Sequence, residues 1–336
     1  MQSQPILELK NVSKRFTTPL DVAAKIANVL GAKAVEKTVY AVHDVNLYVS
    51  EGEVVGLVGE SGCGKSTLGR VAAGLHPPTT GSRFWQGTDT KTLEASLSRG
   101  DYRKRMLAIQ MIFQDPYASL NPRMRVQEII GEAPVAHGFI AAKSQADYVA
   151  ELMGKVGLDA VYMRRFPHQF SGGQRARIDI ARALAVQPQF LVCDEAVAAL
   201  DVSIQAQVIN LFMKLRDDLK LTYLFISHDL GVVRHLADRL VVMYLGRIVE
   251  TGPAAEVFAR PNHPYTRALL AEAPTLEVKK KQFAAVQGEI PSPLNPPTGC
   301  HFHPRCPQAM AVCKIQAPAL TTLSSGHASA CHLNQL

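Results

Sequence analysis

The residues best suited to chemistry lie in the segment GESGCGKST, which directly follows the apolar run VVGLV. Its Gly-x4-Gly-Lys-Ser spacing places bare backbone between a predicted strand and a predicted helix. Glycine allows successive N–H groups to converge on one anion, and the positive end of the helix adds to that attraction. The segment is therefore predicted to bind the phosphates of a nucleotide. The residues concerned are Gly59, Ser61, Gly62, Cys63, Gly64, Lys65, Ser66 and Thr67.

The lysine and serine near the end of this segment are expected to have separate roles. Lys65 would bridge the β- and γ-phosphates of the nucleotide, and the Ser66 hydroxyl would hold Mg²⁺. At Cys63 the backbone N–H is expected to do the binding, so that the thiol is incidental. A plain glycine turn is the alternative, and the strand before the loop and the helix after it argue against that interpretation.

An acidic pair ends a second apolar run, FLVCDEA. Asp194 and Glu195 follow a predicted buried strand, and ligands of α/β proteins bind at the carboxyl ends of such strands. Asp194 is predicted to orient Mg²⁺ through a water molecule, and Glu195 to position the attacking water or accept its proton. Taken alone, the pair could also begin a helix, but together with the phosphate-binding segment it indicates nucleotide hydrolysis.

The elements that would position these groups alternate between strand and helix. An apolar strand at residues 54–58 precedes the phosphate-binding segment, and a helix follows from Lys65 to about residue 73. Further on, a helix from residue 172, the strand FLVCD, a helix from Ser203 and the strand LTYLFIS predict a parallel α/β sheet. We also expect strands at 6–12 and 41–49, mainly helical residues at 115–170, and a hairpin that turns at Leu245–Gly246.

Two stretches lie outside this alternation. Residues 17–39 separate the first two predicted strands, and the spacing of Val22, Ile26, Val29 and Leu30 predicts an inserted amphipathic helix. Its expected role is a surface decoration, with a partner contact as the alternative. Beyond about Pro253 the sequence becomes rich in proline, lysine and then cysteine, which predicts a second, smaller domain.

Composition limits the class of protein. The chain of 336 residues is 47% hydrophobic, enough for a sizeable core, and has a net charge of +7. This charge is spread out, so no nucleic-acid partner is expected, and a solvated surface near anionic lipid is the alternative. No apolar run reaches about 18 residues. No leader pattern opens the sequence. Neither a transmembrane helix nor a signal peptide is expected, and the chain is predicted to be soluble and cytosolic.

Four further segments resemble motifs of one family, the ABC ATPases. FSGGQRARIDIARAL is similar to their signature sequence, IFQDP to the Q-loop, AALD to the D-loop and FISHD to the switch histidine. The resemblance covers about residues 5–270. It implies an α/β fold of the ABC-type P-loop ATPases, with a RecA-like core, an antiparallel β subdomain and a helical subdomain at about 115–170. It also implies an ATPase domain at 5–255 and a small cysteine-containing C-terminal domain at 256–336.

The signature segment would complete an ATP site in a second subunit. It opens a helix whose free N–H groups would bind the γ-phosphate of ATP held by that subunit, so each site is divided between two chains. Asp201 would link the two sites across the interface. The signature residues implied to contact ATP are Ser171, Gly172, Gly173 and Gln174.

The resemblance also implies catalytic and adenine-binding residues. Gln114 would touch Mg²⁺ and the attacking water while sensing the transport subunit, so that Ser66, Gln114 and Asp194 together hold the ion. His228 would contact the γ-phosphate and steady the transition state. Phe16 is predicted to stack on adenine, with Tyr40 as the alternative, and ordinary core packing is the other possibility for either ring.

Longer stretches resemble one group of these proteins, the oligopeptide/dipeptide/nickel importers. They are QDPYASLNPRM, DEAVAALDVSIQAQ, DLGVVRHLADRLVVMYLGRIVE and HPYTRALL, and DEAV resembles the second of the group's two ATPase subunits. The resemblance implies ATP hydrolysis that powers import of di- or oligopeptides, with nickel, oligosaccharide or another solute as alternative cargo. It further implies a heterodimer with a related ATPase, two membrane permeases and an external solute-binding protein. The chain would be a peripheral subunit on the cytoplasmic face of the inner membrane.

A soluble ABC ATPase that acts on nucleic acid or ribosomes is the competing class. Such proteins usually carry two cassettes in one chain, or a long coiled-coil arm between the P-loop and the signature. One cassette is present here, and the interval from Gly59 to Ser171 leaves no room for such an arm. The transport ATPase is therefore the favoured interpretation.

Four cysteines near the end of the chain form a separate pattern, Cys300-x5-Cys306-x6-Cys313-x17-Cys331. In a cytosolic chain such clustering favours metal binding over disulfides. Thiolates suit zinc and an iron–sulfur cluster equally, although the spacing lacks the CxxC pairs of a zinc ribbon. Resemblance to the importer group favours a [4Fe–4S] cluster, with Zn²⁺, four buried free thiols or a redox-responsive regulator as alternatives. A nearby histidine could replace one cysteine ligand, although these histidines are expected to be solvated surface residues: His301, His303, His327 and His332.

Overall fold

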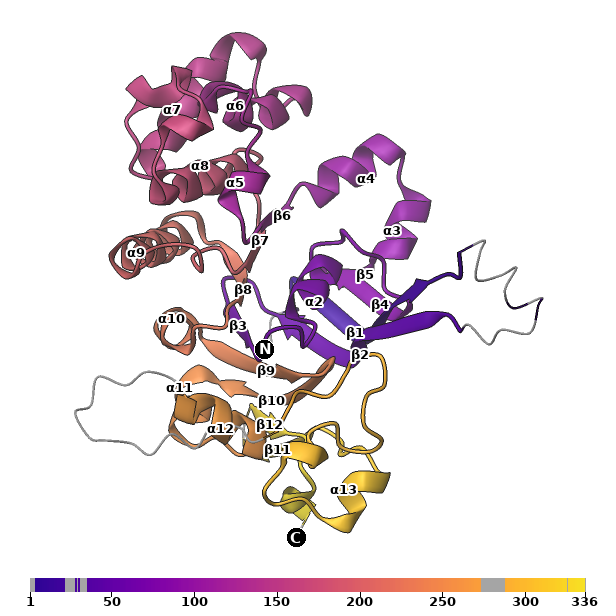
Figure 1. Cartoon of the computed structure of the whole chain (residues 1–336). Helices are drawn as coiled ribbons and strands as arrows, with labels where there is room; N and C mark the ends of the chain where they lie inside the picture. Colours follow the sequence, from indigo (N-terminus) through magenta and orange to yellow (C-terminus); the bar gives the residue numbers. More distant parts are fainter. Residues whose placement is uncertain are drawn as a thin grey trace.

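Two β-sheets with a helix packed between them form the centre of the molecule (Figure 1). In the part of the chain that the structure describes, the larger sheet has the strand order β11-β12-β10-β9-β3-β8-β7-β6 and the smaller one β2-β1-β4-β5. The structure is a computed structural model, and it describes residues 4–21, 28, 30, 35–272, 288–324 and 326–335.

Parallel strands form the centre of the larger sheet. β3 pairs in parallel with β8 and β9, and β7 pairs in parallel with β6 and β8. Every residue of β3, β7, β8 and β9 is buried, as expected for parallel strands that are covered on both faces. These strands are β3 (Val54–Val58), β6 (Ile109–Ile112), β7 (Phe190–Asp194), β8 (Thr222–Ile226) and β9 (Arg239–Tyr244).

Helices cover both faces of this sheet. On one face lies α2 (Lys65–Ala72), whose buried Leu68 and Val71 belong to the apolar core shared with the smaller sheet. Apolar side chains of α8 (Gly172–Leu184) and α9 (Val202–Leu219) pack on the other face. The helix α10 (Leu230–Leu236) precedes β9.

The smaller sheet is antiparallel. β1 pairs with both β2 and β4, and β4 pairs with β5. Trp85 at the end of β4 is 1% exposed and lies near Phe190 of β7, so the two sheets share a core. The elements are β1 (Leu7–Thr18), β2 (Lys37–Val49), β4 (Thr80–Trp85) and β5 (Thr88–Asp89), followed by α3 (Thr90–Ser96) and α4 (Arg99–Met106).

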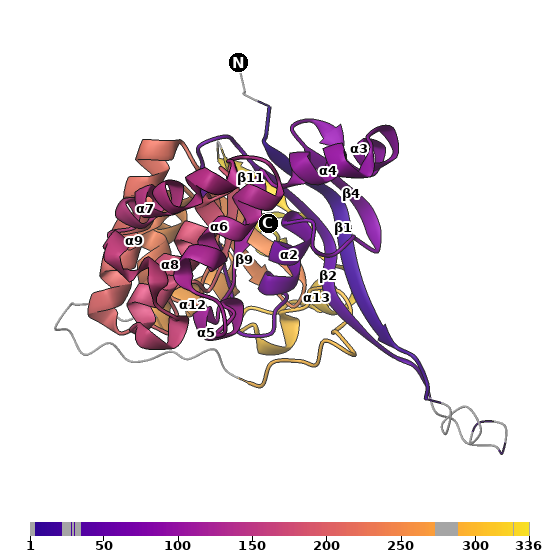
Figure 2. The ribbon, with the colours of Figure 1, turned by 90° about the horizontal axis from the view of Figure 1, so that it is seen from above.

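The prediction of an inserted helix at 17–39 is wrong at both ends of this segment, where the structure has strands instead. β1 continues to Thr18, β2 begins at Lys37, and these two residues pair with each other. Figure 2 shows the two strands running side by side away from the body of the molecule. Backbone pairing between distant residues therefore overrides the local helical spacing. Of the four residues on which the prediction depended, Val22, Ile26 and Val29 lie outside the described residues, and Leu30 lies in a turn and is 83% exposed.

The segment predicted to be mainly helical forms a lobe that stands apart from α2 in Figure 1. Its buried apolar side chains, Val126, Ile130, Val149 and Met153 among them, form one core with α8 and α9. The lobe contains α5 (Pro116–Ser119), α6 (Val126–Ala136), α7 (Gln145–Lys155) and short 3₁₀ turns at Ala142–Ser144, Ala160–Arg164 and Pro167–Gln169.

The C-terminal region extends the larger sheet. β10 (Arg247–Pro253) pairs antiparallel with β9 and with β12 (His327–Ser329), and β12 pairs with β11 (Thr321–Ser324). Glu250 of β10 is fully buried and accepts a hydrogen bond from Nε2 of His327 at 2.8 Å. The region also contains α11 (Ala254–Ala259), α12 (Pro264–Glu272), α13 (Ala311–Ile315) and 3₁₀ turns at His303–Arg305 and His332–Gln335. A domain border near residue 255 stays a prediction.

Several predicted elements agree with the structure. The strands expected at 54–58 and 190–194 have those bounds, and the late hairpin turns at Leu245–Gly246. The strands β4 and β6 were not predicted. Among the described residues, no helix combines the length and the apolar character needed to cross a membrane.

Candidate ATP-binding and hydrolysis site

The phosphate-binding segment forms a tight loop between β3 and α2. Gly64 precedes α2 with φ 104°, and a Cβ atom there would lie 2.0 Å from the carbonyl oxygen of Ala41. Glycine is therefore needed at this position. Lys65 is 4% exposed, and its Nζ donates to the carbonyl oxygens of Gly59 at 2.8 Å and Glu60 at 3.0 Å. The ammonium group thus lies over the loop whose N–H groups would bind an anion.

Oxygen ligands for a hard cation lie beside this loop. The Ser66 hydroxyl, in the first turn of α2, donates to Oδ1 of Asp194 at 2.8 Å. Asp194 ends β7 and is 3% exposed. Burial raises the pKa of Asp194, while the hydrogen bond from Ser66 and the charge of Arg70 act in the opposite direction. A hydroxyl and a carboxylate oxygen in this arrangement suit Mg²⁺.

The three predicted catalytic residues meet at one carboxylate oxygen. Oε2 of Glu195 accepts a hydrogen bond from Nε2 of Gln114 at 2.8 Å and lies 3.4 Å from Nδ1 of His228. These side chains come from the segments that follow β7, β6 and β8, and parallel strands bring their carboxyl ends to one edge of the sheet. Glu195 has φ 50°, and its N–H donates to the carbonyl oxygen of Ile226 at 2.9 Å. The backbone thus directs its carboxylate toward the other two residues.

The signature segment begins α8. The Ser171 hydroxyl accepts from the N–H of Gln174 at 3.3 Å, and the Ser171 N–H donates to Oε1 of Gln174 at 3.1 Å. This reciprocal cap fixes the helix start. A Cβ atom on Gly173 would lie 2.3 Å from Cγ2 of Ile204, so α8 closely approaches α9, which begins after Asp201. Both hydrogen bonds between Ser171 and Gln174 stay within this segment and do not involve the phosphate-binding loop.

The two aromatic candidates for adenine stacking lie on adjacent strands. Phe16 of β1 is 41% exposed and contacts His76 edge-on, with a centroid distance of 5.7 Å. Tyr40 of β2 is less exposed and lies under the Arg15 guanidinium, whose carbon is 5.0 Å from the ring centroid. Phe16 therefore has more ring surface available for a ligand, and its role stays a prediction.

Comparisons with known proteins identify the family. A family model described as "ABC transporter" matches residues 42–198, and one described as "Oligopeptide/dipeptide transporter, C-terminal region" matches residues 249–313. The chain is 46% identical over 333 residues to the oligopeptide transport ATP-binding protein AppF of Bacillus subtilis (strain 168), covering 98% of each chain. The chain belongs to the ATP-binding subunits of the oligopeptide/dipeptide ABC importers.

Other similar proteins agree with this family. The importer ATPase is 45% identical over 302 residues to the dipeptide transport ATP-binding protein DppF of Haemophilus influenzae (strain ATCC 51907 / DSM 11121 / KW20 / Rd), covering 90% of this chain and 91% of that protein. Its fold is similar to the ATP-binding cassette MJ0796, solved as a post-hydrolysis dimer bound to ADP and Pi, with a TM-score of 0.60 and 26% identity over 74% of this chain and 98% of that one. The importer ATPase is thus an ATP-hydrolysing enzyme with the ABC fold.

Sequence reasoning missed two arginines of the importer ATPase that face the candidate site. A cavity of about 480 Å³ is lined by Ser66, Gln114 and Asp194 together with Arg70 of α2 and Arg182 of α8. Arg70 lies one helical turn after Ser66, and Arg182 lies inside the signature segment, two turns after Gln174. Helical spacing places such residues on the same face as the motif, and this spacing is the signal that could have found them.

The four C-terminal cysteines are free and line one small cavity. Burial raises the pKa of Cys300 to about 11 and also raises the pKa values of Cys306 and Cys331. Among the described residues, no three or more His, Cys, Asp and Glu side chains are grouped closely enough to hold a single metal ion. Neither zinc nor an iron–sulfur cluster is shown, and metal binding by the four cysteines stays a prediction. The fourth thiol in this cavity belongs to Cys313.

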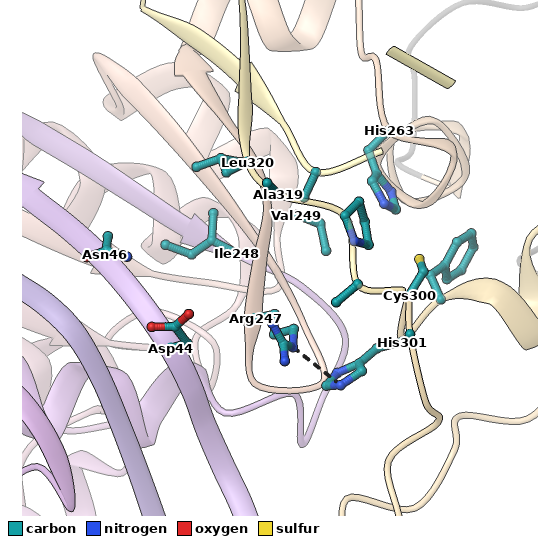
Figure 3. Close-up of a pocket in the computed structure, with 15 residues that line it drawn as sticks. Asp44, Asn46, Arg247, Ile248, Val249, His263, Cys300, His301, Ala319 and Leu320 are labelled. Atoms are coloured by element: carbon teal, nitrogen blue, oxygen red, sulfur yellow. Dashed lines mark hydrogen bonds between the residues drawn. The ribbon is translucent and has the colours of Figure 1, made fainter. Parts of the chain in front are cut away.

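The expectation that the C-terminal histidines are solvated surface residues is wrong for three of them. His301, His327 and His332 are each less than 10% exposed, and His303 is partly buried. Burial lowers the pKa of His301 to about 4, so the ring is neutral. Its Nε2 accepts from Nε of Arg247 at 3.3 Å in a cavity of about 320 Å³ between β2, β10 and the C-terminal region (Figure 3). His301 and His327 join the C-terminal region to Arg247 and Glu250 of β10, whereas His332 bonds to the carbonyl oxygen of Gln316 within that region.

Proposed function

We propose that this importer ATPase hydrolyses ATP to drive the import of di- or oligopeptides across the cytoplasmic membrane. The main support for the hydrolysis site is that Gln114 and His228 both contact the carboxylate of Glu195. The hydrogen-bonded pair of Ser66 and Asp194 lies beside them. The names of the similar proteins support peptide as the cargo class, since one is an oligopeptide and another a dipeptide transport ATP-binding protein. Nickel and oligosaccharide are the alternative cargoes.

The chain's own residues divide the reaction between them. Lys65 and the loop N–H groups bind the β- and γ-phosphates, while Ser66, Asp194 and Gln114 would hold Mg²⁺. The ion would supply positive charge beside the phosphates. Glu195 positions the attacking water and accepts its proton. Gln114 and His228 keep the carboxylate in place through their contacts with Oε2.

A second, related ATPase subunit would complete each site. The N-terminus of α8 carries free N–H groups suited to the γ-phosphate, and Ser171, Gly172, Gly173 and Gln174 lie there. Their separation from the phosphate-binding loop of the same chain supports binding to nucleotide in the partner. Asp201 would lie at that interface, and binding of ATP would close the two subunits on each other.

The remaining partners would be two membrane permeases and an external solute-binding protein. We place the importer ATPase as a peripheral subunit on the cytoplasmic face of the inner membrane. The lobe at 115–170 begins directly after Gln114, so movement of a permease against this lobe would reach the catalytic carboxylate through that side chain.

A [4Fe–4S] cluster in the C-terminal region is part of the same proposal. The support is that Cys300, Cys306, Cys313 and Cys331 line one cavity without disulfides. Thiolates suit zinc and iron–sulfur clusters alike, so Zn²⁺ is the alternative occupant of this cavity.

Two measurements test the metal proposal. Anaerobically purified protein should show a broad absorption band near about 400 nm and bound iron. The variant Cys306→Ser should lose both. Stoichiometric zinc without this band would contradict the cluster and favour the zinc alternative.

Uptake by cells tests the transport proposal. A strain that lacks this gene should lose uptake of labelled di- and oligopeptides, the parental gene should restore it, and Lys65→Ala should fail to do so. Parallel uptake of labelled nickel and oligosaccharide serves as the cargo control. Loss of nickel or oligosaccharide uptake, with peptide uptake intact, would contradict the proposed cargo.

A further inference from the structure

A buried arginine of the C-terminal region forms an ion pair with the phosphate-binding loop. Arg305 donates from Nη1 to Oε2 of Glu60 at 2.7 Å and from Nη2 to Oε1 at 2.8 Å. This is a two-pronged ion pair between residues that are 245 positions apart. The side chains of Arg305 and Glu60 are 4% and 18% exposed. Such a pair fixes both the position and the orientation of the Glu60 carboxylate, because the guanidinium and the carboxylate are planar.

The backbone of the same loop residue is held as well. The N–H of Glu60 donates to the hydroxyl of Tyr265 at 2.8 Å, and its carbonyl oxygen accepts from Nζ of Lys65 at 3.0 Å. Tyr265 lies on α12 and is fully buried. Both the backbone and the side chain of Glu60 are therefore fixed, and two of its partners, Tyr265 and Arg305, come from beyond β10.

Aromatic packing makes this contact rigid. The rings of Tyr244 and Tyr265 have centroids 4.7 Å apart, and Phe302 contacts both at 5.3 Å and 5.4 Å. The hydroxyl of Tyr244 also lies 3.4 Å from Nη1 of Arg305. Since these rings are buried, neither Arg305 nor Tyr265 can move away from the loop without disturbing a packed core.

We propose that Arg305 and Tyr265 are positioning residues for ATP binding, which act by holding Glu60 and through it the phosphate-binding loop. Neither residue lies among the groups that hold Mg²⁺ or activate water. Lys65 shares the carbonyl oxygen of Glu60, so a shift of Glu60 also moves the ammonium group that contacts the phosphates. The C-terminal region thereby has a direct physical route to the nucleotide. This inference depends on ATP hydrolysis and not on the nature of the cargo.

The proposal predicts a loss of nucleotide affinity with little loss of chemistry. Loop N–H groups that are no longer held must be ordered when ATP binds, which weakens binding, whereas Glu195 keeps its contacts. In the assembled importer, Arg305→Met should raise the KM for MgATP about tenfold, which corresponds to about 1.4 kcal/mol. The kcat at saturating ATP should change by less than about twofold. The change weakens binding of ATP and of the transition state equally, so the barrier from bound ATP stays the same. Arg305→Lys keeps the charge without the two-pronged geometry and should restore part of the affinity.

Two milder variants keep the proposal testable if Arg305→Met fails to fold. Tyr265→Phe removes one hydroxyl and keeps the packed ring, and it should raise the KM by about threefold, as the loss of one modest hydrogen bond predicts. Glu60→Gln should resemble Arg305→Met, and the two changes combined should cost less than the sum of the single effects, because they remove the same interaction. Arg267→Met is the matched control, since this exposed arginine of α12 donates from Nε to the carbonyl oxygen of Pro261, outside the phosphate-binding loop.

Steady-state ATP hydrolysis against MgATP concentration, with thermal unfolding of each variant, decides the matter. The expected result is a raised KM in folded Arg305→Met and Glu60→Gln, and parental values in Arg267→Met. An unchanged KM in folded Arg305→Met, or additive effects in the double variant, would overturn the proposal. A fall in kcat with constant KM would also overturn it, because it would place the effect in the chemical step.

Discussion

Replacing Glu195 by glutamine tests the hydrolysis site most directly. Oε2 of Glu195 accepts from Gln114 at 2.8 Å and lies 3.4 Å from Nδ1 of His228. A glutamine carbonyl oxygen can take the same place, so both neighbours keep their partner and the side-chain volume is unchanged. What is lost is the negative charge and with it the ability to accept a proton. Nucleotide binding and folding should therefore stay close to the parental values.

The size of the effect follows from the role assigned to the carboxylate. A positioned general base contributes about 10²–10⁴-fold to the rate. The barrier should accordingly rise by about 3–5 kcal/mol. The assay is ATP turnover by the assembled importer at saturating MgATP, together with the affinity for MgATP measured without turnover. We expect turnover to fall by about 10²–10⁴-fold and the affinity to change by less than about threefold.

Glu151→Gln is the matched control, because this surface carboxylate of α7 pairs with Lys155 at 2.8 Å and not with the groups of the hydrolysis site. It should hydrolyse ATP at the parental rate. Parental turnover by Glu195→Gln in the assembled complex would refute the assignment of the base. Loss of MgATP binding in that variant would instead show that Glu195 holds the nucleotide.

Three further predictions concern other parts of the molecule. Phe16→Ala should weaken ATP binding by about 1–3 kcal/mol, the worth of base stacking, and Tyr40→Ala much less; equal losses in an equilibrium binding assay would contradict this choice of ring. Gly173→Ala should reduce turnover, because its Cβ would lie 2.3 Å from Cγ2 of Ile204, and adding Ile204→Ala should restore it; failure of this rescue would exclude steric contact as the cause. Burial lowers the pKa of His263 to about 4 from 6.5, so the folded ring stays neutral while the unfolded ring takes up a proton as the pH falls below 6.5. The free energy of unfolding, measured with urea, should therefore fall by about 2 kcal/mol more between pH 7.5 and 5.0 in the parent than in His263→Gln; equal slopes would contradict the neutral buried ring.

Much of the central sheet could be predicted from local sequence. The strands β3 and β7 are short apolar runs. The phosphate-binding segment follows β3, and Asp194 is the last residue of β7. Continuous apolar residues are expected where both faces of a strand are covered, so the type and bounds of these elements can be read from a few neighbouring residues. The hairpin at Leu245–Gly246 was predictable for the same reason, because a two-residue turn separates two apolar runs.

Other elements could not be predicted because their partners are distant in the chain. β4 carries a mixture of exposed and buried residues and is held by pairing with β1, about seventy positions away. The spacing of apolar residues within 17–39 predicts a helix, yet the ends of this segment form strands in which Thr18 pairs with Lys37. The burial of His301, His327 and His332 also depends on β12 joining β10, which local composition does not reveal.

The sequence by itself determined the chemistry of this protein, because a phosphate-binding loop needs its glycines, lysine and serine at adjacent positions. Gly59, Lys65 and Ser66 could therefore be assigned without coordinates. Only the tertiary structure decided which distant groups hold that loop. The contact of Arg305 with Glu60 spans 245 positions and exists because β10, α12 and the C-terminal turns pack against the loop, an arrangement that no local pattern encodes.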